Sequence, residues 1–508
     1  MAYVNLYDTT LRDGAQSPHV RFTTEGKLEA TRLIDGLGVD YIEGGFPQAG
    51  GHEEYFSRVR EQKTIAKVAA FGMTPRSADF ENDPNLMPLA KAGTDVVTLV
   101  AKSSAMQIRE VLKTGPEQYR KLTGDAVRYL KSLGKEVVLD AEHYMDAASD
   151  DEAFALGILE ACGDADWLVL CDTNGGTSYR KVGGFVRKAI DAVGNKVGYH
   201  CHNDRGLATA CTVEAAYAGA RQLQGTINGI GERAGNADLV HVIGNLSEEC
   251  DDGFEMGAHP EKLMLTSGAI ERLSGWSMLP NAPFVGRLAF AHSGGMHSDA
   301  MNKMDDSYEH FRPEDFGNER SFPISGQAGR TAILMKLRSW GIDLDKQSPI
   351  ATGLLEDLNG LGYVGDAQFY RMFRKRAGGY SDPIELESIN VSDKIRPDGS
   401  RPEAIVKVLM NGRRLMEVSE GDGQVDAIDK ALRKLLMPIF PFVEQVKLLS
   451  YTVPPITGTG TDASVQVRTY FANGGDRWDS FSTGTDLIAA SAMNLLDAYR
   501  FFLLRHEE

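Results

Sequence analysis

The stretch that decides the fold reads VNLYDTTLRDGAQSPHVRFTTEGKLEATRLIDGL, residues 4–37. A short β-rich run, Val4–Asp8, ends in a cluster of polar residues, and an amphipathic segment, Glu25–Leu37, follows it. The same order of strand, polar loop and helix recurs through roughly the first 250 residues, which is the size of a closed parallel barrel.

Seven further runs have strand character: Tyr41–Phe46, Ala66–Phe71, Asp95–Val100, Glu136–Glu142, Trp167–Asp172, Val197–His202 and Leu223–Ile230. Helix-like segments follow them, for example Pro116–Leu133 and Tyr179–Val193. This count favours an α/β fold of the (β/α)₈ TIM-barrel type over an open doubly wound sheet, which usually has fewer units.

The rhythm changes after the barrel, and the sequence predicts three domains: a barrel over 1–274, a mostly helical linker region over 275–382 and a C-terminal α+β domain over 383–508. The strands predicted for the last domain are Ile384–Val391, Glu403–Met410, Arg413–Glu420, Phe442–Thr452 and Ala463–Ala472, and its helices are Gln424–Met437 and Thr485–Phe502. This doubled pattern carries no obvious catalytic cluster, so a regulatory or dimerising role is expected.

Charge and cysteine content limit the partners and the compartment. A net charge of −17 argues against nucleic acid or an anionic membrane as a partner, because both need a basic face. The five cysteines form no CxxC pair, which favours a reducing, cytoplasmic compartment. We expect no signal peptide and no membrane-spanning segment.

Reactive residues of a TIM barrel lie where its strands end. The first predicted strand ends with Arg12 and Asp13. The seventh ends with His200 and His202, which share one face because side chains alternate along a strand, while Cys201 points the other way. Two imidazoles spaced in this way form half of a metal site, although a structural ion pair or a turn would also explain each motif alone.

Three more strand ends carry polar groups. Asp140 and Glu142 share the inward face of the fifth strand, where carboxylates are costly unless they are paired or functional. Thr173 follows the sixth strand and could donate its hydroxyl to a substrate carboxylate, or simply cap a turn. A glycine-rich loop over 228–236 follows the eighth strand and supplies Asn236, an oxygen donor. One carboxylate, two imidazoles and an amide oxygen would suit a metal that chelates a 2-oxo acid.

Several of these motifs resemble one enzyme family. The runs at 8–14, 200–204 and 231–236 resemble the 2-isopropylmalate/homocitrate/citramalate synthases, metal-dependent TIM-barrel enzymes named for an Asp/Arg/Glu signature. The segment at 293–297 resembles the family's linker motif around a histidine, and those at 308–310, 317–320 and 325–330 are most similar to the citramalate synthases. The run at 421–427 resembles the opening of the family's C-terminal allosteric domain. The likeness spans nearly the whole chain.

The resemblance implies a role for individual residues. Metal ligands would be Asp13, His200, His202 and Asn236, with Mn²⁺, Zn²⁺, Mg²⁺ or Co²⁺ as the ion. Substrate would be bound by Arg12, Thr173, Asp140 and Tyr144. Catalysis would involve Arg12, Glu142, His297 and Tyr308, the last two from the linker of a partner subunit. The side chains expected to select the 2-oxo acid are Phe71, Leu99, Val100, Asp140 and Tyr144.

The reaction implied is a Claisen-type condensation of acetyl-CoA with a 2-oxo acid, pyruvate first, giving (R)-citramalate and CoA for isoleucine biosynthesis. The alternatives are 2-isopropylmalate synthesis from 2-oxoisovalerate, homocitrate synthesis, a lyase on the same barrel, and a regulatory homologue without activity. The resemblance also implies a homodimer or higher homo-oligomer and inhibition by isoleucine or leucine. His143 departs from the Asp that many isopropylmalate synthases have at this position.

Overall fold

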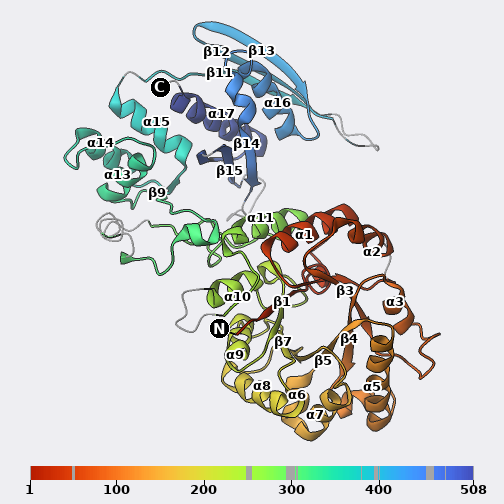
Figure 1. Ribbon diagram of the computed structural model, residues 1–508. Helices are drawn as coiled ribbons and strands as arrows, with labels where there is room; N and C mark the ends of the chain where they lie inside the picture. The colour runs from red at the N-terminus through yellow and green to blue at the C-terminus, as the bar shows by residue number, and fades with distance from the viewer. Residues whose placement is uncertain are drawn as a thin grey trace. The chain divides into compact units, whose positions relative to one another are not determined.

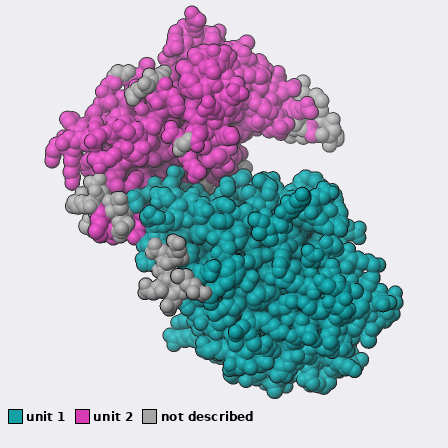
Figure 2. Space-filling model, viewed as in Figure 1, with its two compact units in different colours: residues 1–290, 310–320 teal, residues 291–309, 321–508 magenta. Residues whose placement is uncertain are grey.

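The computed structural model describes residues 2–48, 52–247, 254–292, 304, 307–378, 380–393, 399, 401–453, 463–474 and 476–506. The chain divides into two compact units, shown in different colours in Figure 2. Unit 1 comprises residues 1–290 and 310–320, and unit 2 comprises 291–309 and 321–508. The boundaries expected at 274 and 382 remain a proposal for a finer division.

Unit 1 is a closed parallel barrel, as predicted, in which β1 pairs with both β2 and β8 (Figure 1). Its strands are β1 Asn5–Asp8, β2 Tyr41–Gly45, β3 Lys67–Met73, β4 Val96–Lys102, β5 Glu136–Glu142, β6 Trp167–Asp172, β7 Val197–Cys201 and β8 Gln222–Gly225. The surrounding helices are α1 Thr24–Leu37, α2 His52–Val59, α3 Leu86–Lys91, α4 Ala105–Glu110, α5 Pro116–Ser132, α6 Tyr144–Asp150, α7 Glu152–Ala161, α8 Tyr179–Val193, α9 Ala208–Tyr217, α10 Leu239–Leu246 and α11 Leu263–Ser274.

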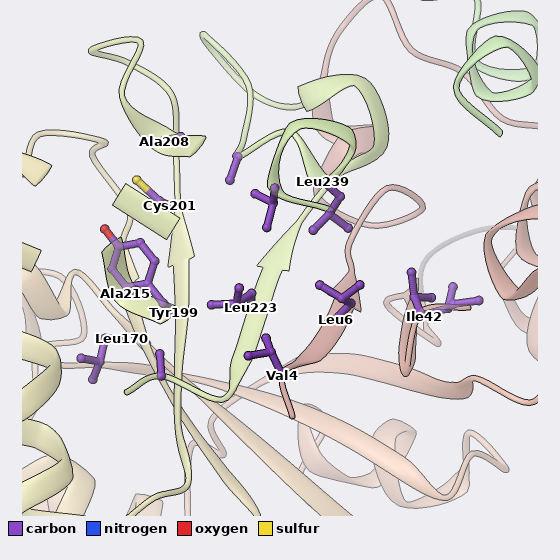
Figure 3. Packing of buried hydrophobic residues seen from close by; sticks show 14 of the residues in the cluster. Val4, Leu6, Ile42, Leu170, Tyr199, Cys201, Ala208, Ala215, Leu223 and Leu239 are labelled. Atoms are coloured by element: carbon purple, nitrogen blue, oxygen red, sulfur yellow. The ribbon is translucent and has the colours of Figure 1, made fainter. Parts of the chain in front are cut away.

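Two layers of apolar side chains hold the barrel because successive residues of a strand face opposite sides. Outward-facing residues pack under the helices, and Figure 3 shows Leu6, Tyr199 and Leu223 from three neighbouring strands with Leu239 of α10. The barrel interior holds a smaller cluster, consisting of Tyr7, Tyr41, Ala69, Val96, Val138, Val169 and Cys171. Polar side chains such as Asp13, Glu142, His200 and His202 line a cavity at the carboxyl ends of the strands.

Strand β8 is shorter than its sequence suggested. The run Leu223–Ile230 was expected to be extended, but the strand ends at Gly225 and the chain turns into the 3₁₀ helix η3, Ile227–Gly229. Asn228 within it has a left-handed backbone, with φ at 64°. The turn brings the glycine-rich loop back over the barrel end, because Thr226 and Asp238 form a β-bridge.

Unit 2 contains two three-stranded antiparallel sheets and an adjoining helical region. The first sheet orders β11 Glu385–Ser392, β12 Glu403–Met410 and β13 Arg413–Glu420, followed by α16 Gln424–Leu436. The second orders β14 Lys447–Thr452, β15 Val465–Asn473 and β16 Asp476–Gly484, followed by α17 Leu487–His506. The remaining elements are β9 Ile324–Ser325, α13 Arg330–Ser339, α14 Pro349–Leu358, β10 Tyr363–Val364 and α15 Asp366–Ala377.

Helix α17 is long and apolar enough to cross a membrane by length and composition. In its most apolar window, however, 78% of the residues are buried within the protein, and its Leu495, Tyr499 and Phe502 belong to the core of unit 2. Its apolar character is therefore that of a core helix.

Candidate active site

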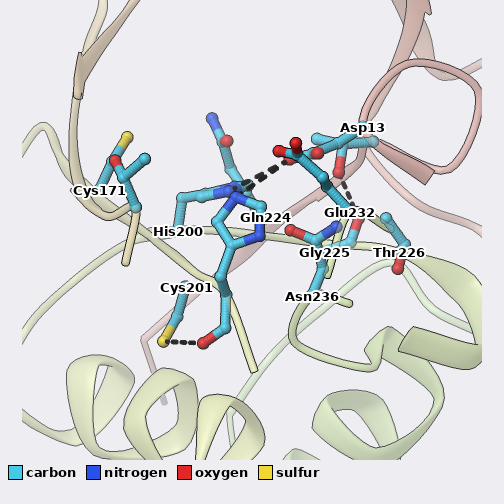
Figure 4. A network of polar contacts seen from close by, with 12 residues as sticks. Asp13, Cys171, His200, Cys201, Gln224, Gly225, Thr226, Glu232 and Asn236 are labelled. Atoms are coloured by element: carbon cyan, nitrogen blue, oxygen red, sulfur yellow. Dashed lines mark hydrogen bonds and ion pairs between the residues drawn. The ribbon is translucent and has the colours of Figure 1, made fainter. Parts of the chain in front are cut away.

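Asp13, His200 and His202 converge at the carboxyl end of the barrel. The Nε2 atoms of His200 and His202 lie 3.4 and 3.7 Å from Oδ2 of Asp13, and all three residues are buried. Figure 4 shows the Asp13 carboxylate facing the His200 imidazole, with Asn236 from the loop after β8 nearby. Among the described residues these three form the group of acidic, His and Cys side chains whose donor atoms are close enough to hold a metal ion.

The fourth expected ligand, Asn236, fits the same site. It is 1% exposed and forms a β-bridge with His202. Its Nδ2 donates to the carbonyl of Ile230 at 3.1 Å, while its Oδ1 has no hydrogen-bond partner, as is true of Oδ1 of Asp13. A buried oxygen without a partner is costly. Two such oxygens beside two imidazoles are therefore the donor set that a divalent cation would satisfy.

The protonation states suit a metal site. Burial lowers the pKa of His202 to about 4, so its imidazole is neutral at pH 7. Burial alone would raise the pKa of Asp13, but Arg12 and the two imidazoles outweigh burial and hold that pKa well below its usual range. A neutral imidazole and an ionised carboxylate are the forms that bind metals.

Arg12 lies between the metal-site carboxylate and a second, buried carboxylate. Its Nη1 is 3.3 Å from Oδ2 of Asp13, and its Nε forms a short ion pair with Glu43 of β2. The guanidinium stacks on the Phe71 ring at 4.0 Å. Glu43 also accepts a hydrogen bond of 2.9 Å from Tyr7. Sequence reasoning missed Glu43, although an acidic residue inside an otherwise apolar predicted strand was a usable signal.

Glu142 and Thr173 end the neighbouring strands β5 and β6 and line one cavity with Arg12. The Glu142 carboxylate pairs with Lys102 of β4 at 2.6 Å. Thr173 accepts the backbone N–H of His143 through its hydroxyl oxygen at 2.8 Å. The cavity of about 710 Å³ lies at the barrel end, and its lining also includes the apolar side chains of Met73, Val111, Leu112 and Leu122, together with Arg76.

Asp140 forms part of the inner cavity wall. It is 4% exposed, and its carboxylate accepts a hydrogen bond of 3.0 Å from Gln224 of β8. Burial and the nearby Glu43 raise the pKa of Asp140 to about 6. Phe71 and Val100 share this wall. The neighbouring residue Leu99 faces outward into the layer under the helices.

Other expected site residues lie elsewhere. Tyr144 begins α6 and is buried in the packed layer under the helices, so its side chain does not line the cavity. Tyr308 belongs to unit 2 and is half exposed. His297 lies outside the described residues.

Comparison with known proteins assigns three parts of the chain to families. Residues 3–266 match the HMGL-like family, residues 284–352 the homocitrate synthase post-HMGL domain-like family, and residues 363–503 the LeuA allosteric (dimerisation) domain. An (R)-citramalate synthase of Aquifex aeolicus is 36% identical, with 99% of this chain and 98% of the relative covered. The chain belongs to the HMGL-like family, in the group of the (R)-citramalate synthases.

Other relatives support the same assignment. An (R)-citramalate synthase of Sulfolobus acidocaldarius is 38% identical over 98% of this chain and 97% of the relative. A probable 2-isopropylmalate synthase of Methanopyrus kandleri is 34% identical over 91% of each. As a member of this group the chain is an acyltransferase-type enzyme with a C-terminal allosteric domain.

Proposed function

We propose that this HMGL-like enzyme condenses acetyl-CoA with pyruvate to give (R)-citramalate and CoA. The observation that carries the proposal is the convergence of Asp13, His200 and His202 in a cavity also lined by Arg12 and Thr173. Full-length similarity to several (R)-citramalate synthases supports the choice of substrates.

The donor set fits a divalent cation such as Mn²⁺, Zn²⁺, Mg²⁺ or Co²⁺, held by Asp13, His200, His202 and Asn236. Such an ion would supply Lewis acidity toward the keto group of the 2-oxo acid. The remaining steps belong to side chains of the chain itself.

Arg12 would stabilise the negative charge that develops on the keto oxygen as the new carbon–carbon bond forms. Its guanidinium is preorganised for this task by Glu43 and by the Phe71 ring, so little reorganisation is needed during the reaction. The Thr173 hydroxyl would donate to the substrate carboxylate and orient the keto carbon.

A base must remove a proton from the acetyl methyl group before attack. We propose as that base either Glu142 or His297, which with Tyr308 would come from the linker of a partner subunit. Lys102 is 2.6 Å from the Glu142 carboxylate and orients it. Water then cleaves the thioester, releasing CoA and the second carboxylate of the product.

The cavity wall favours a small 2-oxo acid. A branched apolar side chain would have to pack against the buried Asp140 carboxylate, which disfavours 2-oxoisovalerate. Asp140 and Glu142 would repel the distal carboxylate of 2-oxoglutarate. The methyl group of pyruvate meets neither obstacle. The apolar part of the cavity lining suits the pantetheine arm of acetyl-CoA, and Arg76 suits its phosphates.

The test is thiol release from acetyl-CoA by metal-loaded enzyme with pyruvate, 2-oxoisovalerate or 2-oxoglutarate, followed by chiral analysis of the product. We expect release with pyruvate, its loss in His202→Ala, and normal activity in His259→Ala, whose imidazole is exposed at the opposite end of the barrel. Thiol release with 2-oxoisovalerate alone would keep the chemistry and refute the proposed substrate. If none of the three 2-oxo acids supports thiol release, both are refuted.

For unit 2 we propose a homodimer or higher homo-oligomer and feedback inhibition by isoleucine or leucine. The match of residues 363–503 to the LeuA allosteric (dimerisation) domain supports both. Rate assays with either amino acid and light scattering would test them; a monomer that neither amino acid inhibits would refute this proposal.

A further inference from the structure

Thr173 is held from two sides by residues of neighbouring loops. Its hydroxyl oxygen accepts the His143 N–H at 2.8 Å, and its carbonyl oxygen accepts a hydrogen bond of 2.7 Å from Nη2 of Arg233. His143 follows β5 and Arg233 follows β8, so Thr173 at the end of β6 is tied to loops on either side.

The contact with His143 determines what the Thr173 hydroxyl can do. A hydroxyl has one hydrogen to donate and two lone pairs to accept. Because one lone pair receives the His143 N–H, the hydrogen remains free to point into the cavity that Thr173 lines. The hydroxyl therefore keeps its hydrogen available to donate, as a substrate carboxylate requires.

Arg233 is itself fixed by Asp204, in the loop after β7. Its Nε and Nη2 each lie 2.9 Å from a carboxylate oxygen of Asp204, a bidentate arrangement. The backbone of Arg233 is left-handed, with φ at 56°, as is that of His143, with φ at 60°. Such conformations are uncommon outside glycine and persist where surrounding contacts impose them.

We propose that Arg233, held by Asp204, is a positioning residue that fixes Thr173 so that its hydroxyl can donate to the carboxylate of the 2-oxo acid. The inference rests on the proposed function for the identity of the ligand, and it adds a second layer of residues that determines 2-oxo acid affinity.

A competing role follows from the fact that Arg233 also lines the cavity. If Arg233 bound the substrate anion directly, its loss and the loss of Thr173 would act independently. If Arg233 acts through Thr173, its loss has no further effect once the Thr173 hydroxyl is absent. A double-mutant cycle separates these cases.

The cycle comprises wild type, Arg233→Gln, Thr173→Ala and the double variant, with KM for pyruvate and for acetyl-CoA measured on metal-loaded enzyme. We expect each single change to raise KM for pyruvate about 10-fold, the double variant to match Thr173→Ala, and KM for acetyl-CoA to stay unchanged. Asp204→Asn should shift KM for pyruvate in the same direction. A double effect equal to the product of the single effects, about 100-fold, would overturn the proposal, as would wild-type behaviour of Arg233→Gln.

Arg205→Gln is the matched control. Arg205 also donates to a carbonyl of the loop after β6, that of Gly176, at 2.9 Å, but it does not line the cavity. We expect its KM for pyruvate to equal that of wild type. Metal affinity and melting temperature of each variant are measured in parallel. If Arg233→Gln lowers both and raises KM for both substrates together, Arg233 has a merely structural role and the proposal is refuted.

Calorimetric titration of the metal-loaded variants with pyruvate repeats the cycle without turnover. If the wild type condenses nothing but the effects of the two substitutions on Kd are coupled, the proposed condensation is refuted and the positioning role is kept. If the wild type condenses pyruvate but the two substitutions act on Kd independently, the positioning role is refuted and the proposed condensation is kept.

Discussion

At the scale of single residues, Glu43 balances the charge of Arg12 inside the barrel. Its carboxylate is buried and accepts both the Arg12 guanidinium and the Tyr7 hydroxyl. A buried arginine without its counter-charge would be free to change rotamer or draw in water, because the cost of leaving a charge unpaired in the interior is several kcal/mol, about 3 to 5.

We therefore expect Glu43→Gln to lower kcat for condensation by about 10- to 100-fold, since the transition-state contact of Arg12 would be misplaced. Glutamine preserves the volume and can still accept from Tyr7, so the barrel should remain folded, but the loss of the counter-charge should lower its melting temperature. Steady-state kinetics and circular dichroism on the same samples check both outcomes. A kcat equal to that of wild type would show that Arg12 is fixed by other contacts.

The residues of the candidate site differ in how far the sequence could reveal them. Asp13, His200 and His202 were recognisable because their spacing and their strand-end position agree. Glu43 is a single charge in an apolar run and has no partner nearby in sequence; its partner Arg12 is 31 positions away. Leu99 and Val100 were named together, yet alternation along a strand allows one of two neighbours to face the cavity.

At the scale of elements, the loop after β8 depends on a glycine beside the proposed metal ligand Asn236. A Cβ added at Gly231 would lie 2.2 Å from Nδ2 of Asn236, a clash that only movement of the amide could relieve. Gly231→Ala should therefore weaken metal affinity by about 10- to 100-fold, the range seen when a ligand loses its support.

Gly184→Ala in α8 is the control for this change, because an added Cβ there meets no atom within 4 Å. Alanine at an open helical position should stabilise slightly, by about 0.5 to 1 kcal/mol, and leave metal affinity unaltered. Calorimetric titration with Mn²⁺ or Zn²⁺ measures the metal affinity of both variants. Equal affinities in Gly231→Ala and wild type would argue against Asn236 as a ligand.

Strand β16 was missed by the sequence prediction because DRWDSFSTG, residues 476–484, looks like a polar loop. Its pairing with β15 and its contacts with α15 and α17 hold it in the sheet. Asp479 of this strand is buried and accepts hydrogen bonds from the Tyr363 hydroxyl and, at 2.8 Å, from the Asp366 N–H. Long-range pairing of this kind is not readable from local composition.

Burial, with help from Asp366, raises the pKa of Asp479 to about 6, above the ordinary value of 3.8. The folded protein therefore binds this proton more tightly than the unfolded chain. The free energy of unfolding should then fall as pH rises from about 4 to 6, by up to about 3 kcal/mol. Asp479→Asn should flatten that dependence. Denaturant unfolding at pH 4.5 and 7 measures the free energy of unfolding of both proteins. If Asp479→Asn shows the same difference between the two pH values as wild type, Asp479 is not the source of the pH dependence.

At the scale of the whole molecule, metal binding should be visible in stability. An ion bound only by the folded barrel adds about 2.7 kcal/mol when its free concentration is 100 times its Kd, which raises the melting temperature by about 5 °C. Chelation should remove that gain from wild type and leave His202→Ala unchanged. Scanning calorimetry with and without EDTA checks the difference, and an equal shift in both proteins would place the metal elsewhere.

The overall organisation was predictable further than the site was. Repeated strand–helix units determine a closed barrel, because eight parallel strands with helices between them close in only one common way. The two repeated halves of unit 2 were also predictable, because strands followed by a helix recur in the sequence. What the sequence could not give is the packing of Tyr144 under the helices, which depends on distant residues of the core.

Barrel closure has a consequence for how the enzyme is made. Asp13 follows the first strand, His200 and His202 come with the seventh, and Asn236 follows the eighth, which pairs with the first. Nearly the entire barrel therefore has to be synthesised before a nascent chain contains all the proposed metal ligands. If these four residues hold the ion as proposed, a partly synthesised chain presents only Asp13, which binds a divalent cation weakly, and metal binding should follow the folding of the barrel.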